Sequence, residues 1–237
     1  MESKRDIHSI CDEYGIIDYT INPDGSIDVD GNIILSYVFE RGETKIPLKF
    51  AKVIGDFECN RNQLTTLKGS PKSVGGNFEC SDNKLTSLEY CPESVGGNFD
   101  CDRNQLTTLK GSPKSVGGNF YCHSNQLTSL EGLPEIGGYI NCHSNQITDF
   151  RGVPEFFEGY FYCEGNPIEE IYKLFLQEDS INDSKCIKWL NEFDVIQGDK
   201  VVLDRLEEVF YQLGMDIPQS VVNIGLKNLT FKNYEII

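Results

Sequence analysis

The sequence repeats itself with a period of 21 residues. Residues 75–95 read GGNFECSDNKLTSLEYCPESV, residues 96–116 read GGNFDCDRNQLTTLKGSPKSV, and residues 117–136 read GGNFYCHSNQLTSLEGLPEI, one residue shorter. Further copies occupy residues 54–74 and 137–157, and a partial sixth copy follows. Self-similarity at a fixed period of this length is typical of a solenoid, in which each unit stacks on the next. The repeat therefore predicts an elongated, stacked architecture.

Each repeat contains the motif F-x-C, which predicts a short β-strand with one buried face. Side chains two residues apart in a strand point the same way, so the Phe and the Cys both face the interior. Stacking places successive strands side by side in a parallel sheet, about 4.8 Å apart. One cysteine per repeat is a packing feature, because zinc sites need clustered cysteines and disulfides need pairs. The cysteines of this ladder are Cys59, Cys80, Cys101, Cys122, Cys142 and Cys163.

The other repeated positions complete each unit. An Asn lies at the strand exit, where its side-chain amide can satisfy loop backbone groups, and stacked copies form a ladder. Two Leu, Ile or Phe positions fill the rest of the core. The return path on the convex side is too short for a full helix, so we expect turns, extended or short 3₁₀ segments there. The Asn ladder consists of Asn62, Asn83, Asn104, Asn125, Asn145 and Asn166.

The unit G-x-F-x-C-x-x-N-x-L-T-x-L-x-G-x-P-x-x-V resembles the leucine-rich repeat, L-x-x-L-x-L-x-x-N-x-L, with Phe and Cys in the strand-core positions. The resemblance covers about residues 53–171 and implies an α/β solenoid with short parallel strands on its concave face. Because terminal repeats expose core, both ends are expected to carry caps. The predicted division is an N-terminal cap of a helix and a hairpin (1–52), leucine-rich repeats (53–167) and a C-terminal helical cap (168–237).

Local patterns predict the elements of the two ends. Apolar residues at helical spacing indicate an amphipathic helix over residues 4–14. The pattern of residues 19–29 predicts a hairpin with Asp24-Gly25 as its turn. Residues 33–35 are expected to form an irregular first strand. In the C-terminal region we expect a helix opened by Pro167, a helix after Asp183, and a helix over about 201–213 that stops at Gly214.

The chain is strongly acidic, with 37 Asp and Glu residues against 21 Lys and Arg residues and a formal net charge of −16. This charge argues against direct binding to nucleic acid or to an anionic membrane, since both favour basic surfaces. No stretch approaches the roughly 20 apolar residues of a membrane helix, and the N-terminus lacks the apolar segment of a secretory signal. Together with the unpaired cysteine ladder, these features predict a reduced cytoplasmic protein.

The residues between the buried strand positions point outward, onto the predicted concave face. They are acidic in the first three repeats and include four tyrosines and two histidines in the last three. Tyrosine is frequent at binding hot spots, although polar residues are also needed on any solvated strand and Tyr is a good strand former. The candidate partner-binding residues are Glu58, Glu79, Asp100, Asp102, Tyr121, His123, Tyr139, Asn141, His143, Tyr160 and Tyr162.

No constellation of acid, base and nucleophile stands out in the sequence. His123 and His143 occupy equivalent positions about 5 Å apart in adjacent repeats, but no acidic third ligand lies between them, which favours a binding surface over a metal pair. Residues 22–32 are acidic yet do not fit the EF-hand spacing. A phosphate-cradling glycine loop and an H-E-x-x-H motif are both missing. We therefore expect a non-enzymatic protein without cofactor or metal.

Three stretches resemble leucine-rich repeat proteins encoded by tailed bacteriophages. They are ICDEYGIIDYTINPDGSIDVDGNIIL, the repeat core, and GNPIEEIYKLF with VVLDRLEEVF, while ILSYVFERGET departs from the usual first repeat. The resemblance implies a protein–protein interaction module in the host cytoplasm. We expect it to bind a host or antiviral-defence protein through the concave face, in the most specific version as an inhibitor. Two alternatives stay open: an acidic nucleic-acid mimic that blocks a DNA- or RNA-binding protein, and a working C-terminal region for which the repeats are a scaffold.

Overall fold

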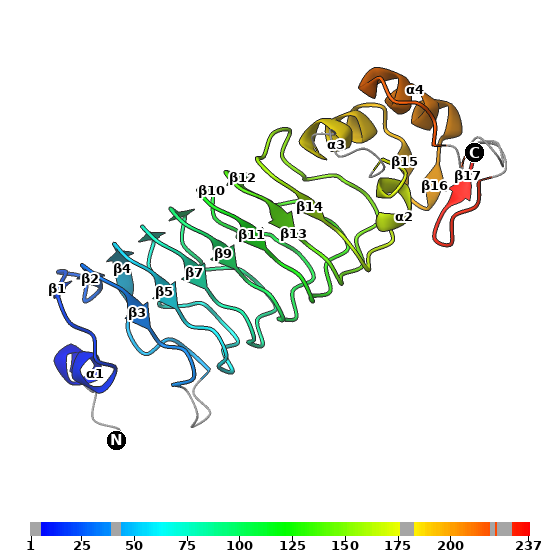
Figure 1. The fold of residues 1–237 in the computed structure, drawn as a ribbon. Coiled ribbons are helices and arrows are strands. Elements are labelled where there is room, and N and C mark those ends of the chain that lie inside the picture. Colours follow the sequence, from blue (N-terminus) through cyan, green and yellow to red (C-terminus); the bar gives the residue numbers. More distant parts are fainter. Residues whose placement is uncertain (1–5, 39–43, 176–182, 219–220, 222–228) are drawn as a thin grey trace.

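The computed structural model describes residues 6–38, 44–175, 183–218, 221 and 229–237. Figure 1 shows an elongated molecule with the N-terminal helix at one end and the C-terminal helices at the other. The chain forms a parallel β-solenoid of about six turns. The solenoid predicted from the repeat period is confirmed.

Four helices and seventeen short strands make up the described chain. The helices are α1 (Ile7–Glu13), α2 (Glu169–Tyr172), α3 (Asp183–Glu192) and α4 (Leu203–Leu213). The strands are β1 (Tyr19–Ile21), β2 (Ile27–Val29), β3 (Ile33–Ile34), β4 (Phe50–Val53), β5 (Phe57–Glu58), β6 (Ser73–Val74), β7 (Phe78–Glu79), β8 (Ser94–Val95), β9 (Phe99–Asp100), β10 (Ser115–Val116), β11 (Phe120–Tyr121), β12 (Glu135–Ile136), β13 (Ile140–Asn141), β14 (Phe161–Tyr162), β15 (Ile196–Gln197), β16 (Lys200–Val201) and β17 (Glu235–Ile236).

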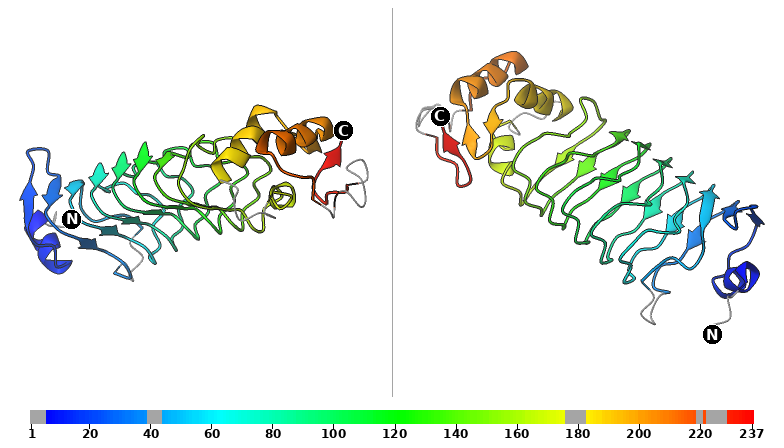
Figure 2. Two further views of the ribbon diagram at one scale, coloured as in Figure 1. Left: turned by 45° about the horizontal axis from the view of Figure 1, so that its top comes forward. Right: turned by 180° about the vertical axis from the view of Figure 1, so that it is seen from behind.

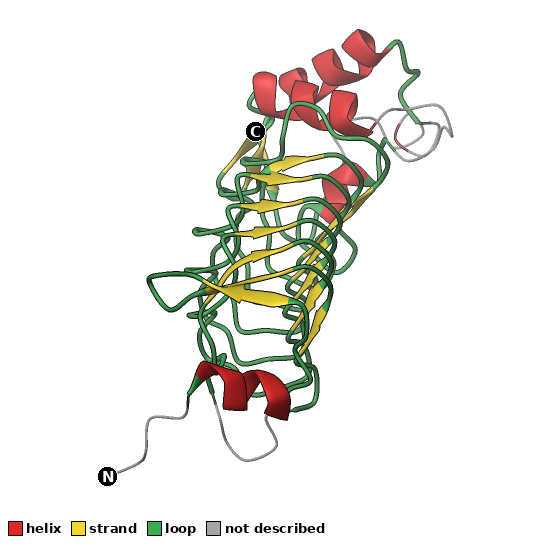
Figure 3. Cartoon of the chain, turned by 90° about the vertical axis from the view of Figure 1, so that its left-hand side faces the viewer, coloured by secondary structure: helices red, strands yellow, loops and turns green. Residues whose placement is uncertain are grey.

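Two seven-stranded sheets run along the solenoid, and the coils are seen stacked in Figures 2 and 3. Sheet A has the order β1-β2-β4-β6-β8-β10-β12, and sheet B has the order β14-β13-β11-β9-β7-β5-β3. Within these two sheets all pairs are parallel except the β1–β2 hairpin. A third, three-stranded sheet has the order β15-β16-β17. The F-x-C strands form sheet B, as predicted. The return path takes the extended alternative, and its strands pair into sheet A.

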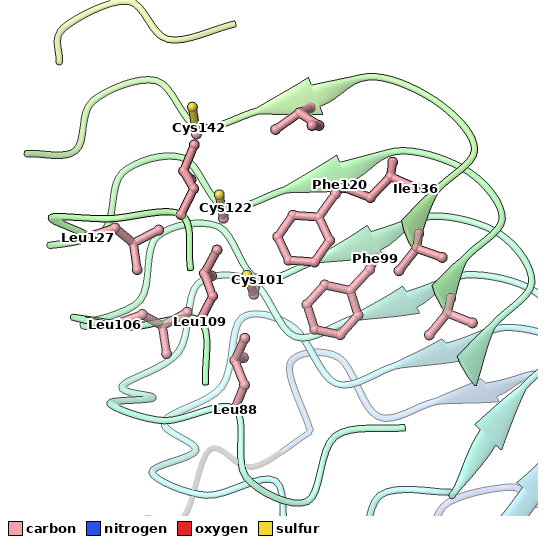
Figure 4. Close-up of a cluster of buried hydrophobic side chains, with 14 of the residues drawn as sticks. Leu88, Phe99, Cys101, Leu106, Leu109, Phe120, Cys122, Leu127, Ile136 and Cys142 are labelled. Carbon is pink, nitrogen blue, oxygen red and sulfur yellow. The ribbon is translucent and has the colours of Figure 1, made fainter. Parts of the chain in front are cut away.

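The interior is filled by equivalent side chains stacked from coil to coil. Successive Phe rings from Phe57 to Phe120 stack with centroids 5.1–5.5 Å apart, and each fully buried ring contributes about 2–3 kcal/mol to folding. The six repeat cysteines are at most 3% exposed, and all nine cysteines are free thiols. Figure 4 shows Cys101, Cys122 and Cys142 beside the Phe and Leu ladders. The packing role predicted for the cysteines is confirmed.

The asparagines that follow the sheet B strands hydrogen-bond to the backbone of their own coil and of the preceding coil. The Nδ2 group of Asn104 donates to the carbonyls of Cys80, Cys101 and Asp102 at 3.0–3.1 Å. Its Oδ1 accepts the backbone N–H of Leu85 at 3.0 Å. Each buried Asn therefore links two coils and satisfies backbone groups on both, as predicted.

Glycine at the corner between the two sheets sets the close approach of the coils. A Cβ on Gly96 would lie 2.2 Å from the carbonyl oxygen of Gly75, and the same holds at 2.3 Å between Gly117 and Gly96. Larger residues there would force the coils apart. An open groove of about 810 Å³ runs along sheet A beside these glycines and is also lined by Phe156.

The N-terminal region contains the predicted helix and hairpin. Helix α1 begins after Asp6, whose Oδ1 accepts the backbone N–H of His8 at 2.7 Å; residues 4–5 of the predicted helix lie outside the described residues. Strand β2 pairs with β4, and β3 pairs with β5. Coil stacking thus begins at Ile27, inside the region assigned to the N-terminal cap.

The C-terminal region contains the helices predicted after Asp183 and before Gly214, which ends α4 with a φ of 68°. The helix predicted at Pro167 is a single turn, α2. Much of the tail that the sequence left unassigned lies outside the described residues, but β17 pairs with β16. Asp183 Oδ2 accepts the backbone N–H of Phe161 at 2.7 Å, on the last strand of sheet B.

No helix in the described part of the chain is long and apolar enough to cross a membrane.

Candidate partner-binding face

The outward side chains of sheet B form three rows along the solenoid, which we call the B face. The central row follows the strand register and contains Glu58, Glu79, Asp100, Tyr121, Asn141 and Tyr162. The row two residues earlier contains Asp56, Asn77, Asn98, Asn119, Tyr139 and Tyr160. The row two residues later contains Asn60, Ser81, Asp102, His123, His143 and Glu164. All eleven candidate residues from the sequence lie in these rows.

In the row two residues before the central row, the side chains of the earlier coils hydrogen-bond to the backbone of the next coil. The Oδ1 atom of Asn77 accepts the backbone N–H of Asn98 at 2.8 Å, and Asn98 in turn accepts that of Asn119 at 2.9 Å. This second ladder ends where Asn119 accepts the N–H of Tyr139 at 3.0 Å. Tyr139 and Tyr160 therefore stand where the earlier coils have an Asn whose side chain accepts a backbone N–H of the next coil. A tyrosine ring at this position does not continue that ladder.

The four tyrosines form one continuous cluster. The Tyr121 and Tyr139 hydroxyls lie 2.5 Å apart, with ring centroids at 5.4 Å in an edge-to-face arrangement. Tyr162 packs edge-to-face on Tyr139 at 5.7 Å and contacts Tyr160 at 6.0 Å. The hydrogen bond with Tyr121, and then burial, raise the pKa of Tyr139 to about 12. Tyr160 is 66% exposed, so the cluster presents aromatic area to solvent.

The two histidines lie side by side, as their equivalent positions predicted, and their rings stack. Their ring centroids are 4.2 Å apart and the planes differ by 12°. His123 Nε2 contacts Asp102 Oδ2, and the two side chains are 16% and 10% exposed. Burial, and then His143, lower the pKa of His123 to about 4. Burial, and then the Asp100 carboxylate, raise the pKa of Asp102 to about 8. The His123–Asp102 pair therefore shares one proton at neutral pH.

Three carboxyls in the acidic half of the B face have raised pKa values. Burial, followed by repulsion from Glu58 and Asp100, raises the pKa of Glu79. Burial also raises the pKa of Asp100. Together with Asp102, these carboxyls line a polar hollow of about 260 Å³. Stacking carboxylates in successive coils brings like charges together, and protonation relieves the repulsion.

Asp102→Asn is expected to stabilise the protein at pH 8 by about 2 kcal/mol and to have almost no effect at pH 4. A carboxyl whose pKa is raised on folding supplies stability below its unfolded pKa, and that stability is lost as the pH rises toward about 8. The neutral amide removes this loss, and Asn60 holds the equivalent position in an earlier coil. Urea unfolding at both pH values measures the effect, with the exposed Asp216→Asn as control. A less stable variant at pH 8 would instead indicate an ionised Asp102 paired with a charged His123.

Sequence reasoning missed three charged residues beside this face. Asp82 Oδ2 lies 3.6 Å from Arg61 Nε and 3.7 Å from Arg103 Nη1. All three have a positive φ at the same point of successive coils. Their shared repeat position was the signal that could have found them, because a one-per-coil position always forms a row.

Within the described ranges, no group of three or more His, Cys, Asp and Glu side chains is placed to hold a metal ion. Comparison with protein-family models, with curated proteins and with solved structures finds no match. Inference about function therefore rests on the B face itself.

Proposed function

We propose that this protein is a non-enzymatic interaction module that binds a partner protein through the B face. The tyrosine cluster is the observation that carries the proposal. Tyr139 and Tyr160 stand where earlier coils need an Asn for the backbone ladder. Aromatic side chains held rigid by their neighbours, with hydroxyls facing solvent, are the usual anchors of protein interfaces.

The acidic half of the B face favours a partner with a basic surface. Glu58, Glu79 and Asp100 follow one another in adjacent coils, so a cationic segment beside them would relieve their repulsion and be steered toward the tyrosines. A nucleic-acid mimic is the second candidate, supported by the net charge of −16. The burial that raises the pKa values of Glu79, Asp100 and Asp102 weighs against it, because a mimic must present its carboxylates at the surface as nucleic acid presents its phosphates.

The proposal extends to the family, the caps and the role of the protein. We propose a leucine-rich repeat protein of phage origin, capped by the α1–hairpin region and by the C-terminal helices, that inhibits a host or antiviral-defence protein in the host cytoplasm. Its support is the resemblance of the three sequence stretches to phage-encoded repeat proteins. The cap assignment is also supported by Asp183, which accepts a backbone N–H at the open edge of sheet B.

Affinity capture from host lysate, followed by mass spectrometry, supplies the partner for a charge test. The triple variant Glu58→Gln, Glu79→Gln, Asp100→Asn is expected to bind about tenfold more weakly at low salt and nearly normally at 0.5 M salt. Charges beside the anchoring residues of an interface act mainly on the association rate, and salt screens them. Surface plasmon resonance at several salt concentrations measures this. Loss of affinity by about 1,000-fold or more would favour the mimic over the tyrosine anchor.

A further inference from the structure

A second hollow lies away from the rows of the B face, where three successive coils turn into sheet A. It has a volume of about 700 Å³ and is lined by residues 45–50, 68–72, 90–91 and 93. Ile46, Leu48 and Phe50 form its floor and are 2–7% exposed. Pro71 and the exposed ring of Tyr90 add further apolar surface. The hollow is therefore apolar at its base and open to solvent.

Tyr90 breaks the repeat at this place. The same position is glycine in the other coils, at Gly69, Gly111, Gly132 and Gly152, where φ is +89 to +111°. Tyr90 adopts a φ of +71°, a conformation that is unfavourable for a bulky side chain. Its side chain is 60% exposed, so burial in the core does not compensate. A strained, exposed aromatic residue at the edge of a hollow is typical of a binding site.

Lysines surround the hollow in a chain that is otherwise strongly acidic. Lys45, Lys49, Lys68 and Lys72 all line it, whereas the whole protein has a net charge of −16. Lys49 pairs with Asp24 at 2.5 Å. For Lys45, Lys68 and Lys72, which are exposed, the described residues offer no carboxylate within ion-pair distance. Glu93, also at the rim, is held by Lys114 at 2.7 Å. Among the described residues these three cations thus have no ion-pair partner, and Lys72 interacts only at longer range with the Glu93 carboxylate.

We propose that this hollow binds a short acidic peptide segment, with an apolar side chain on the Ile46–Leu48 floor against Tyr90 and carboxylates on Lys45, Lys68 and Lys72. Charge complementarity selects an anionic ligand. Two features select a peptide over a nucleic acid: the walls are mainly aliphatic, with one exposed aromatic ring for stacking, and the acidic remainder of the molecule repels a long polyanion. The Cys91 thiol donates to the Gly111 carbonyl and burial raises its pKa to about 12, so it does not act as a nucleophile.

Selection from a phage-displayed library of random decapeptides tests the site. Enriched peptides are expected to carry acidic residues flanking an apolar one. The best of them, synthesised with a fluorescein label, should bind about 100-fold more weakly to the variant Lys45→Glu, Lys68→Glu, Lys72→Glu, and about tenfold more weakly to Tyr90→Gly, by fluorescence anisotropy. Because glycine is the residue of the other coils, Tyr90→Gly should keep or raise the melting temperature.

A triple variant with equal charge change elsewhere, Lys110→Glu, Lys188→Glu, Lys200→Glu, is the matched control and should bind the peptide normally. The proposal is overturned if the selection enriches no acidic peptide, or if binding is the same in the hollow variant and the control. It is also overturned if a labelled 12-nucleotide oligothymidylate binds through these lysines in place of the peptide. A lower melting temperature of Tyr90→Gly with unchanged peptide affinity would make Tyr90 a structural residue.

Discussion

Replacing Tyr121, Tyr160 and Tyr162 together by alanine is expected to weaken partner binding by at least about 1,000-fold, since three anchoring tyrosines jointly contribute about 4 kcal/mol or more. The fold should persist. Tyr160 and Tyr162 are 66% and 37% exposed, and none of the three side chains belongs to the Phe, Cys or Leu ladders. The dissociation constant for the captured partner, measured by surface plasmon resonance beside circular dichroism of the variant, tests both parts.

Two further variants make this test specific. Tyr211 is 77% exposed on α4, so Tyr211→Ala removes an equally accessible tyrosine outside the B face and should leave affinity unchanged. Tyr139→Asn restores the residue of the preceding coils and should preserve stability while reducing affinity. Full affinity in the triple alanine variant would exclude the tyrosine cluster as the anchor of the interface.

Asn104→Ala is expected to cause the largest loss of stability of any single change considered, about 3–4 kcal/mol. The side chain is 8% exposed. It donates to the carbonyls of Cys80, Cys101 and Asp102 and accepts from Leu85. Alanine would leave the buried backbone N–H of Leu85 without a partner, which costs about 1–3 kcal/mol. It would also remove one of two donors from each of the carbonyls of Cys80, Cys101 and Asp102. Urea unfolding at pH 7, followed by circular dichroism, gives the free energy of unfolding.

Asn98→Ala is the matched control for the asparagine ladder. Its side chain accepts a single backbone N–H, from Asn119 at 2.9 Å, on the half-buried outer row. We expect a loss of about 1 kcal/mol. Equal losses in the two variants would mean that the ladder at the strand exits is no more important than the ladder on the B face.

Much of the fold could be predicted because its determinants are local and recur. Phe78 and Cys80 are two residues apart, so their side chains lie on the same face of the strand, and both are buried. The β1–β2 hairpin turns at Gly25 and helix α4 ends at Gly214, and both glycines have a positive φ. Glycine adopts this conformation without steric cost, so both features can be read from the sequence. Sheet A was harder to predict, because Ser94 and Val95 are a two-residue strand that exists only through pairing with neighbouring coils.

The candidate site could be predicted as a set of outward positions, but not as a set of contacts. The repeat alone indicates that Asn98 and Tyr139 are equivalent. Only the stacked coils separate them, since Asn98 holds the next backbone N–H while Tyr139 contacts Tyr121. The hollow beneath Tyr90 was missed for the same reason, because its floor, its lysines and its aromatic rim come from three different coils.

The sequence by itself determined the solenoid, its buried ladders of Phe, Cys, Leu and Asn, and the residues left to face solvent, because a fixed period repeats the same local geometry in every coil. The tertiary structure alone decided which of those outward residues support the backbone, which carboxyls have raised pKa values, and which side chains meet across coils. These properties depend on distances between residues about 20 positions apart, such as the contact of Asp102 with His123, and on the burial that stacking imposes on them.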